Sequence, residues 1–195
     1  MSAGGSLREV SRRAVQSRIA RAAEELFVDK GFEETTVDEI AAAVGMSQRS
    51  FFRYFASKDE VVLDSLERLG EDLAARLAAR PAGEHEWDSL RRAFDPVVER
   101  FGDPVSREHD AAIQRIIDRS PRLLASYLCR LELLQRMLTD ALLARSEDAD
   151  PVVLRAMVGG AFACLHAAAF PACDPEEFAP SLDRTMAALR PVGAR

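Results

Sequence analysis

The sequence predicts an all-α protein with a small N-terminal three-helix domain, built around a helix-turn-helix, and a larger C-terminal helical domain. Three observations lead to this fold class. Apolar residues recur at helical spacing along nearly the whole chain. Pro121, Pro151 and Pro175 each stand at the start of a periodic segment, where a helix loses nothing from a missing amide. No alternating run bounded by turn residues indicates a strand.

The composition is that of a soluble chain with a substantial core. The chain has 195 residues, of which 48% are apolar, enough for one domain or two small ones. Its three cysteines show no metal-ligand spacing, and no secretory signal opens the chain, so we expect a reducing bacterial cytoplasm and no bound metal. The most apolar run, residues 156–170, is short for a membrane span and contains His166, so we expect no membrane partner.

The charge distribution is more informative than the net charge of −6. Nine basic and eight acidic residues precede or include Lys58, whereas 17 basic and 24 acidic residues follow it. The segment from Gly45 through Lys58 holds three basic residues and no acidic one. A local basic patch on an acidic chain argues against a protein that coats nucleic acid by bulk charge.

The N-terminal helices can be placed from their faces and caps. Residues 1–10 show no period and are expected to form a flexible arm. A helical period then begins at Arg12 and ends near Gly31, and Thr36 with Glu39 forms a capping box for a second helix that ends at Gly45. The apolar face of the first helix consists of Val15, Ile19, Ala22, Leu26 and Phe27.

A third helix is expected from Ser47 to about Tyr54, and Ser57 with Glu60 begins a long helix that reaches about Arg80. The remainder is expected to form only helices, over residues 87–101, 106–119, 121–145, 151–170 and 175–190. We therefore divide the chain into an arm (1–10), a helix-turn-helix domain (11–56) and a larger helical domain (57–195).

Helix, glycine, short turn and helix is the plan of a DNA-binding helix-turn-helix. Ala41 is small where the two helices cross, Gly45 permits the left-handed backbone of the turn, and Met46 and Phe51 lock the second helix inward. The outer face of that helix predicts base contacts in a major groove, because glutamine pairs with adenine and arginine with guanine. These candidates are Gln48, Arg49, Ser50 and Arg53.

Ser47, Tyr54 and Lys58 flank this face and are predicted to hold phosphates, which set register without reading sequence. The start of the helix after Ser57 adds free amides to the same site. Each candidate also has a plainer interpretation. Phe51 and Phe55 are typical core residues, and exposed arginines can be a solvated face. Three arginines of the arm region can follow a minor groove or merely keep the arm soluble, and we favour the second; they are Arg8, Arg12 and Arg13.

The segment from Arg12 to about Leu63 resembles the DNA-binding domain of the TetR family of bacterial transcriptional repressors. The matching residues are AAEELFVDKGFEETTVDEIAAAVGMSQRSFFRYFASKDEVV. They include the Thr-Thr-hydrophobic and Ile-Ala pairs, Gly-hydrophobic-Ser, the aromatic pair and Ser-Lys. Phe52 departs from the pattern, since the family commonly has a tyrosine there whose hydroxyl reaches a phosphate. The resemblance therefore assigns phosphate contacts to Thr36, Tyr54 and Lys58 instead.

By the same resemblance, the C-terminal domain is expected to bind a ligand and to dimerise. Residues 156–170 are rich in glycine and alanine, which suits a close helix–helix interface, although the same pattern fits the central helix of one subunit. We favour a homodimer, which also matches a palindromic operator. The candidate interface residues are Arg155, Gly159, Ala163, Ala167, Phe178, Leu182 and Met186.

A ligand pocket is expected between the long middle helices. The absence of a strong charge cluster there favours a small, largely apolar effector. The candidate lining residues are Trp87, Phe94, Phe101, Ile113, Ile117, Tyr127, Met137 and Phe162, with His109, Gln114 and His166 as polar anchors.

Catalysis is disfavoured. Cys164 and His166 are two positions apart on an expected helix and point to different faces, and no phosphate loop or paired carboxylates in an apolar setting occur. No cofactor is expected. The sequence thus predicts a dimeric DNA-binding regulator, a repressor in the favoured interpretation, that a small, largely apolar effector releases from its operator; the sequence itself does not decide between repressor and activator. The alternative is an architectural or ligand-independent DNA-binding protein.

Overall fold

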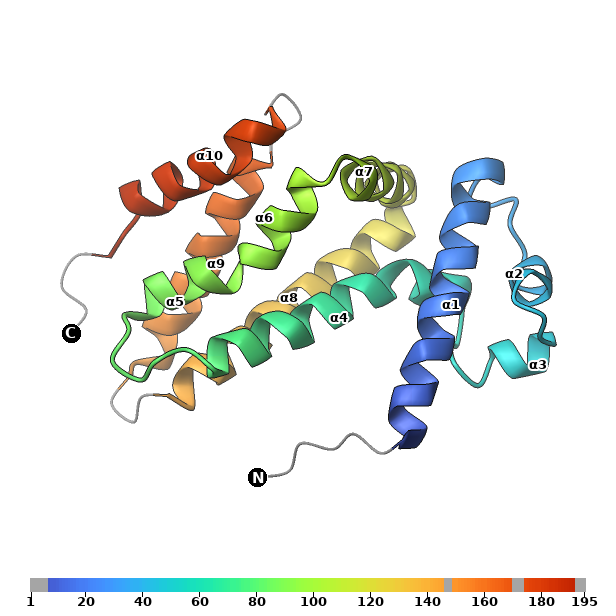
Figure 1. Ribbon diagram of the computed structural model, residues 1–195, viewed down its shortest axis with the longest axis horizontal. Helices are drawn as coiled ribbons and strands as arrows, with labels where there is room; N and C mark the ends of the chain where they lie inside the picture. The colour runs from blue at the N-terminus through green and yellow to red at the C-terminus, as the bar shows by residue number, and fades with distance from the viewer. Residues whose placement is uncertain (1–6, 146–148, 170–173, 192–195) are drawn as a thin grey trace. The chain divides into compact units, whose positions relative to one another are not determined.

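A computed structural model describes residues 7–145, 149–169 and 174–191 of the chain, and these residues form helices and connecting turns without a strand (Figure 1). The fold class predicted from the sequence is confirmed. The helices are α1 (Leu7–Lys30), α2 (Val37–Ala43), α3 (Gln48–Phe51), α4 (Lys58–Ala78), α5 (Glu86–Ala93), α6 (Asp95–Gly102), α7 (Pro104–Arg119), α8 (Pro121–Leu143), α9 (Pro151–Ala168) and α10 (Pro175–Ala188).

Side-chain caps and prolines set where several helices begin. The carboxylates of Asp150 and Asp174 accept hydrogen bonds from the amides of Val152 and Glu176, directly before the proline-led first turns of α9 and α10. Proline suits this position because the first amides of a helix have no intrahelical partner.

Several helix boundaries differ from those expected. α3 ends at Phe51 and not near Tyr54. α1 begins at Leu7, inside the segment expected to be an arm. The helix expected over residues 87–101 is two helices, α5 and α6, that meet at Phe94. Pro96 explains the break, because its nitrogen cannot donate the hydrogen bond that a continuous helix would need.

The chain divides into two compact units. The first comprises residues 1–65 and 111–128, and the second comprises residues 66–110 and 129–195. The boundaries fall inside α4, α7 and α8, so each of these helices contributes to both units. The first unit therefore includes residues 57–65 and 111–128, which the sequence-based division assigned to the larger domain.

The core of the first unit lies among α1, α2, α3 and the segments of α4, α7 and α8 that belong to it. Fully buried Phe51 brings α3 into this core, and Phe55 follows it just after the helix. Both residues were expected to be core, and their burial fixes the orientation of α3. Other members of the cluster include Ile19, Ala23, Phe27, Ile40, Val61, Val62, Ile113 and Leu123.

The second unit has its own core, which includes α5, α9 and α10. The indole Nε1 of Trp87 donates a buried hydrogen bond of 2.8 Å to the carbonyl oxygen of Met186. The ring of Phe101 stacks on that of Phe178 with a centroid distance of 4.1 Å. These contacts attach α5 and α6 to α10, and ion pairs of Asp88 with Arg190 and of Arg91 with Asp183 reinforce them.

Among the described residues, one helix, α9, is long and apolar enough to cross a membrane by length and composition alone. It has 18 residues, of which 33% are buried. Its buried side chains, such as Val158 and Ala161, pack in the core of the second unit. Apolar helices of soluble proteins pass the same test, so it indicates only that α9 is long and apolar.

Candidate nucleic-acid interface

The turn between α2 and α3 has the backbone geometry that the sequence predicts. Gly45 has a φ of 72°, in the left-handed region that favours glycine. The amide of Gly45 donates to the carbonyl of Ala42 at 3.0 Å, and the amide of Met46 donates to that of Ala41 at 2.9 Å. These two bonds satisfy carbonyls at the end of α2 and redirect the chain toward α3.

α3 is a short helix held by one cap and one buried aromatic residue. The Ser47 hydroxyl accepts a 3.2 Å hydrogen bond from the amide of Ser50 and lies 3.1 Å from the Ser50 hydroxyl. Phe51 is completely buried. Ser50 is only partly exposed and its hydroxyl lies within hydrogen-bonding distance of the capping Ser47, and its base contact stays a prediction.

The other predicted base-reading residues are exposed on one side of this turn. Gln48, Arg49 and Arg53 are all exposed, and neither arginine forms an ion pair with any residue that the structure describes. Phe52 stands beside them with 50% of its surface exposed, and its ring makes an edge-to-face contact with Phe51 at 5.5 Å. The site thus presents polar and cationic side chains on a backbone that the core fixes.

The first turns of α1 add a second group of basic side chains. Arg8, Ser11 and Arg12 line one surface concavity together with Arg53 and Tyr54. Because α1 begins at Leu7, Arg8 and Arg12 lie one helical turn apart on the same face. The sequence-based interpretation of these arginines as part of a solubilising arm missed this arrangement, since it placed the start of the helix too late.

A family model described as bacterial regulatory proteins, tetR family, matches residues 19–64 of the chain, which contain α2, the turn and α3. Residues 19–64 thus carry the DNA-binding domain of the TetR family. The family resemblance seen in the sequence is thereby confirmed.

Curated relatives of this chain include two named regulators. It is 39% identical over 146 residues to the HTH-type transcriptional regulator TcmR of Streptomyces glaucescens, covering 73% of this chain and 65% of that protein. It is 33% identical over 117 residues to the HTH-type transcriptional activator FasR of Mycolicibacterium smegmatis, covering 59% and 51%. The alignments thus span between half and two thirds of these relatives.

Solved structures of TetR-type regulators share the fold over nearly the whole chain. A TetR-family regulator from Mesorhizobium loti superposes with a TM-score of 0.60 at 19% identity, covering 91% of this chain and 95% of the other. SmeT of Stenotrophomonas maltophilia, described as the repressor of a multidrug efflux pump, gives a TM-score of 0.57 at 21% identity and covers 91% of each chain.

Lys58, for which the family resemblance implied a phosphate contact, has partners within the chain. Its ammonium donates to the carbonyl oxygens of Phe32, Glu33 and Thr35 at 2.6, 3.2 and 3.3 Å. The same nitrogen lies 4.3 Å from the centroid of the Phe32 ring, a cation–π contact. An ammonium has three donors, and all three are used within the chain. A phosphate contact of Lys58 would have to compete with these bonds, and it stays a prediction.

The side chains of the other predicted phosphate residues make different interactions within the chain. Thr36 is exposed and forms the expected capping box, in which its hydroxyl accepts from the amide of Glu39 and the Glu39 carboxylate accepts from the amide of Thr36. Ser47 is exposed and caps α3. Tyr54 is half-buried, with its ring packed against the core and the Arg53 guanidinium 6.0 Å from the ring centroid.

Glu39 connects this capping box to the end of α1. Its carboxylate also accepts a 2.6 Å hydrogen bond from the Lys30 ammonium. The ion pair with Lys30, followed by the bonds from Thr36, lowers the pKa of Glu39 to about 2. The carboxylate thus stays ionised at neutral pH and joins the C-terminus of α1 to the N-terminus of α2.

The predicted pocket residues are distributed between the two compact units. Ile113 and Ile117 are buried in the first core, with Tyr127 packed against it and Gln114 exposed. Burial raises the pKa of the Tyr127 hydroxyl. The others lie in the second unit, where Trp87 and Phe94 are buried, Phe101, His109 and Phe162 are half-buried, and Met137 and His166 are exposed.

The predicted dimer-interface residues separate into two groups. Arg155, Ala163 and Ala167 are exposed on α9, and Gly159 lies partly exposed between them at helical spacing. Phe178, Leu182 and Met186 on α10 are instead buried in the core of their own unit. Because these three side chains already pack within one chain, we correct the candidate interface to the exposed face of α9.

Proposed function

We propose that this chain is a DNA-binding transcriptional regulator that reads an operator with α3 and the residues just after it. The exposed placement of Gln48, Arg49 and Arg53 on a backbone anchored by Phe51 is the observation that supports this proposal most strongly. Glutamine and arginine side chains carry the donor and acceptor pairs that distinguish adenine and guanine in a major groove. Exposed Thr36 and Ser47, with Tyr54 and Arg12, are the proposed phosphate contacts.

We propose repression as the mode of regulation and a homodimer as the active form. SmeT and NalD, which share the fold, are described as repressors of multidrug efflux systems, whereas the relative FasR is named an activator. A two-fold dimer would present two copies of α3 to a palindromic operator. The exposed small residues of α9 would permit close packing of two copies of that helix.

We further propose that a small, largely apolar effector binds the second unit. The aromatic residues Phe94, Phe101 and Phe162 lie in or against its core and would line such a site. SmeT has been solved as a complex with triclosan, an example of a ligand-bound protein of this fold. An effector that favours a conformer unable to fit both half-sites would weaken operator binding and relieve repression.

The operator can be obtained by selection from a library of random duplex DNA with the full-length chain. Fluorescence anisotropy at about 0.15 M salt then compares the selected duplex with a scrambled one. A specific regulator is expected to prefer the selected duplex by a factor on the order of 10³ or more. Equal affinity for the two duplexes would instead favour the architectural alternative.

Arg49→Ala is expected to weaken binding to the selected duplex by about 1–3 kcal/mol and to relax preference at one base position. Arg76→Ala is the matched control, because Arg76 is an exposed arginine of α4 that pairs with Asp72 in the second unit. An equal loss on selected and scrambled DNA would make Arg49 a phosphate contact and not a base contact.

A further inference from the structure

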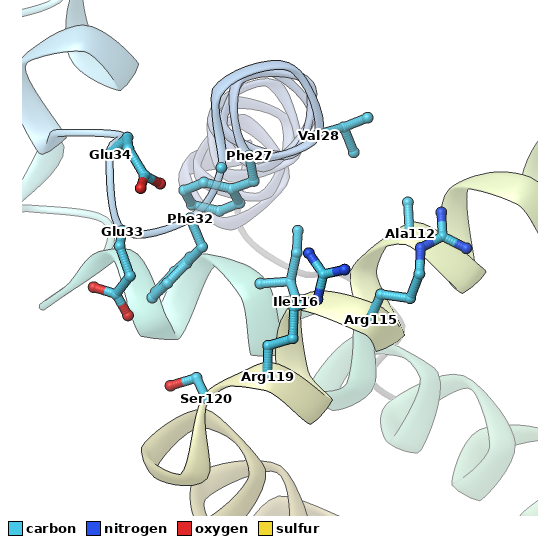
Figure 2. Close-up of a pocket in the computed structure, with 11 residues that line it drawn as sticks. Phe27, Val28, Phe32, Glu33, Glu34, Ala112, Arg115, Ile116, Arg119 and Ser120 are labelled. Carbon is cyan, nitrogen blue, oxygen red and sulfur yellow. The ribbon is translucent and has the colours of Figure 1, made fainter.

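A pocket of about 310 Å³ lies in the first compact unit, apart from the effector site proposed above (Figure 2). One side is formed by the end of α1 and the turn that follows it, residues 27–34. The other side is formed by the C-terminal half of α7 and the residue after it, residues 112–120. Its volume is at the lower end of the range for sites that bind small molecules.

The floor of the pocket is apolar and already ordered. Phe27 is 1% exposed and Phe32 is 8% exposed, and their rings meet edge to face at 5.0 Å. The Lys58 ammonium contacts the face of the Phe32 ring and donates a hydrogen bond to the Phe32 carbonyl oxygen, which fixes this residue. Ile116 of α7 completes the floor, and Val28 at the rim is 55% exposed. An apolar ligand body would cover this exposed valine without a rearrangement of the floor.

One wall of the pocket is cationic. Arg115 and Arg119 are one helical turn apart on α7 and both are exposed. Neither guanidinium has a hydrogen bond or an ion pair with a residue in the described part of the chain. The acids nearest to them along the chain have other partners, since Asp118 accepts from Gln114 and Asp110 pairs with Arg100.

The acidic residues of the pocket lie on the opposite side. Figure 2 shows the carboxylates of Glu33 and Glu34 on one side of Phe27 and Phe32, and Arg115 and Arg119 with Ile116 on the other. Glu33 is 3.9 Å from the Lys58 ammonium, which offsets part of its charge. The apolar floor therefore separates an anion-attracting side from an anion-repelling side.

We propose that this pocket binds a small carboxylate with an apolar body. The carboxylate would accept hydrogen bonds from Arg115 and Arg119, whose planar guanidinium groups match its geometry. The apolar body would lie over Phe27, Ile116 and Val28. The site lies in the unit that carries α3, so, given the DNA binding proposed above, a ligand that binds one conformer of this unit more tightly than another would change operator affinity.

Calorimetry on the full-length chain without DNA tests the binding chemistry. The probes are 2-naphthoate, its neutral carboxamide and the cationic 2-naphthylmethylamine. Naphthoate is expected to bind at least about ten-fold more tightly than either analogue, because only its carboxylate carries a negative charge that both guanidinium groups attract. Tighter binding of the amine, or no detectable naphthoate binding at about 1 mM, would overturn the proposal.

The double variant Arg115→Gln/Arg119→Gln is expected to raise the Kd for naphthoate at least about ten-fold and to remove its advantage over the carboxamide. Arg18→Gln is the matched control, because Arg18 is an exposed arginine of the same unit that does not line the pocket. An unchanged Kd in the double variant, or an equal loss in the control, would contradict the site.

Methyl NMR spectra locate the ligand independently of affinity. Naphthoate is expected to shift the methyl resonances of Val28 and Ile116 and to leave those of Val158, in the second core, unchanged. Shifts confined to the second unit would place the ligand elsewhere. None of these measurements involves DNA, so failure of this site and failure of the proposed operator binding are separate outcomes.

Discussion

At the scale of single residues, Lys58 shows how a side chain of a matched sequence motif can have partners that the motif does not indicate. The Ser-Lys pair stands where the resemblance implies a phosphate contact, yet the ammonium binds three carbonyl oxygens of the α1–α2 turn. Those carbonyls belong to residues more than 20 positions earlier in the chain. Local sequence spacing holds no information about such a contact, so only the folded chain reveals it.

Lys58→Met is therefore expected to lower the free energy of unfolding by roughly 1–3 kcal/mol, because it leaves three carbonyls without their donor. Urea unfolding measures this loss. Lys30→Met is the control, since Lys30 makes a single exposed ion pair with Glu39 and its loss should lower the stability less. A Lys58 variant with normal stability but a shallower salt dependence of DNA binding would support the phosphate contact instead.

Glu39 predicts a pH dependence of stability. Its pKa in the folded chain is about 2, below the ordinary value of 4.5, so the folded state favours the ionised carboxylate. A carboxyl group whose pKa is lower in the folded chain than in the unfolded chain stabilises the fold at pH values above its unfolded pKa. This stabilisation is lost as the pH falls from about 4.5 toward 2. Urea unfolding from pH 6 to pH 2 should thus show a shallower acid dependence for Glu39→Gln than for the native chain. Identical profiles would contradict the prediction.

At the scale of helices and turns, local signals predicted most of the fold. The capping box of Thr36, the Ser47 cap and the three helix-starting prolines are all confirmed. Ser57 caps the amide of Glu60 as expected, but the Glu60 carboxylate accepts from Ala56 and not from Ser57, so the expected reciprocal bond is absent. The break at Phe94 was missed because the apolar period continues across it, although Pro96 gives the physical reason.

Two glycines of the first unit give a graded test of turn geometry. Gly45→Ala is expected to cost about 1–2 kcal/mol from its φ of 72° alone, because an added Cβ would meet no atom within 4 Å. Gly31→Ala should cost at least as much, since its φ is 98°, whereas its Cβ would meet only the end of the exposed Glu34 side chain, which can move aside.

Gly83→Ala is the control for both substitutions, because its Cβ would also meet nothing and its φ is not positive. Its effect on stability is expected to be neutral or slightly favourable. Thermal unfolding of the three variants measures the order of their stabilities. A Gly45 variant as stable as the Gly83 variant would contradict the need for left-handed backbone in the turn.

At the scale of the whole molecule, the sequence could not predict how the chain divides. Helical periodicity shows which face of a helix is apolar but not which compact unit that face joins, and α7 contributes residues to both units. The pocket beside α7 was missed for the same reason, since Phe32 and Arg119 are far apart in sequence. The residues of α3 were predictable because the whole motif lies within one short segment.

The exposed face of α9 predicts the assembly. Ala163→Arg is expected to convert the proposed homodimer into a monomer, because a long charged side chain would stand where two helices approach closely. Light scattering coupled to size exclusion measures the mass. Ala75→Arg, on an exposed position of α4, is the control. A dimeric Ala163 variant would direct the search for the interface to another surface.

The use of Lys58 inside the first unit has a consequence for chemical labelling. The sequence has only two lysines, Lys30 and Lys58, and 22% of the Lys58 side chain is exposed. An acylating reagent must reach the amine nitrogen, whereas three carbonyl oxygens of the chain surround the Lys58 nitrogen. Acylation of Lys58 should therefore follow the opening of the turn, with Lys30 as an internal reference. Mass spectrometry of these two sites would report local unfolding without an introduced probe.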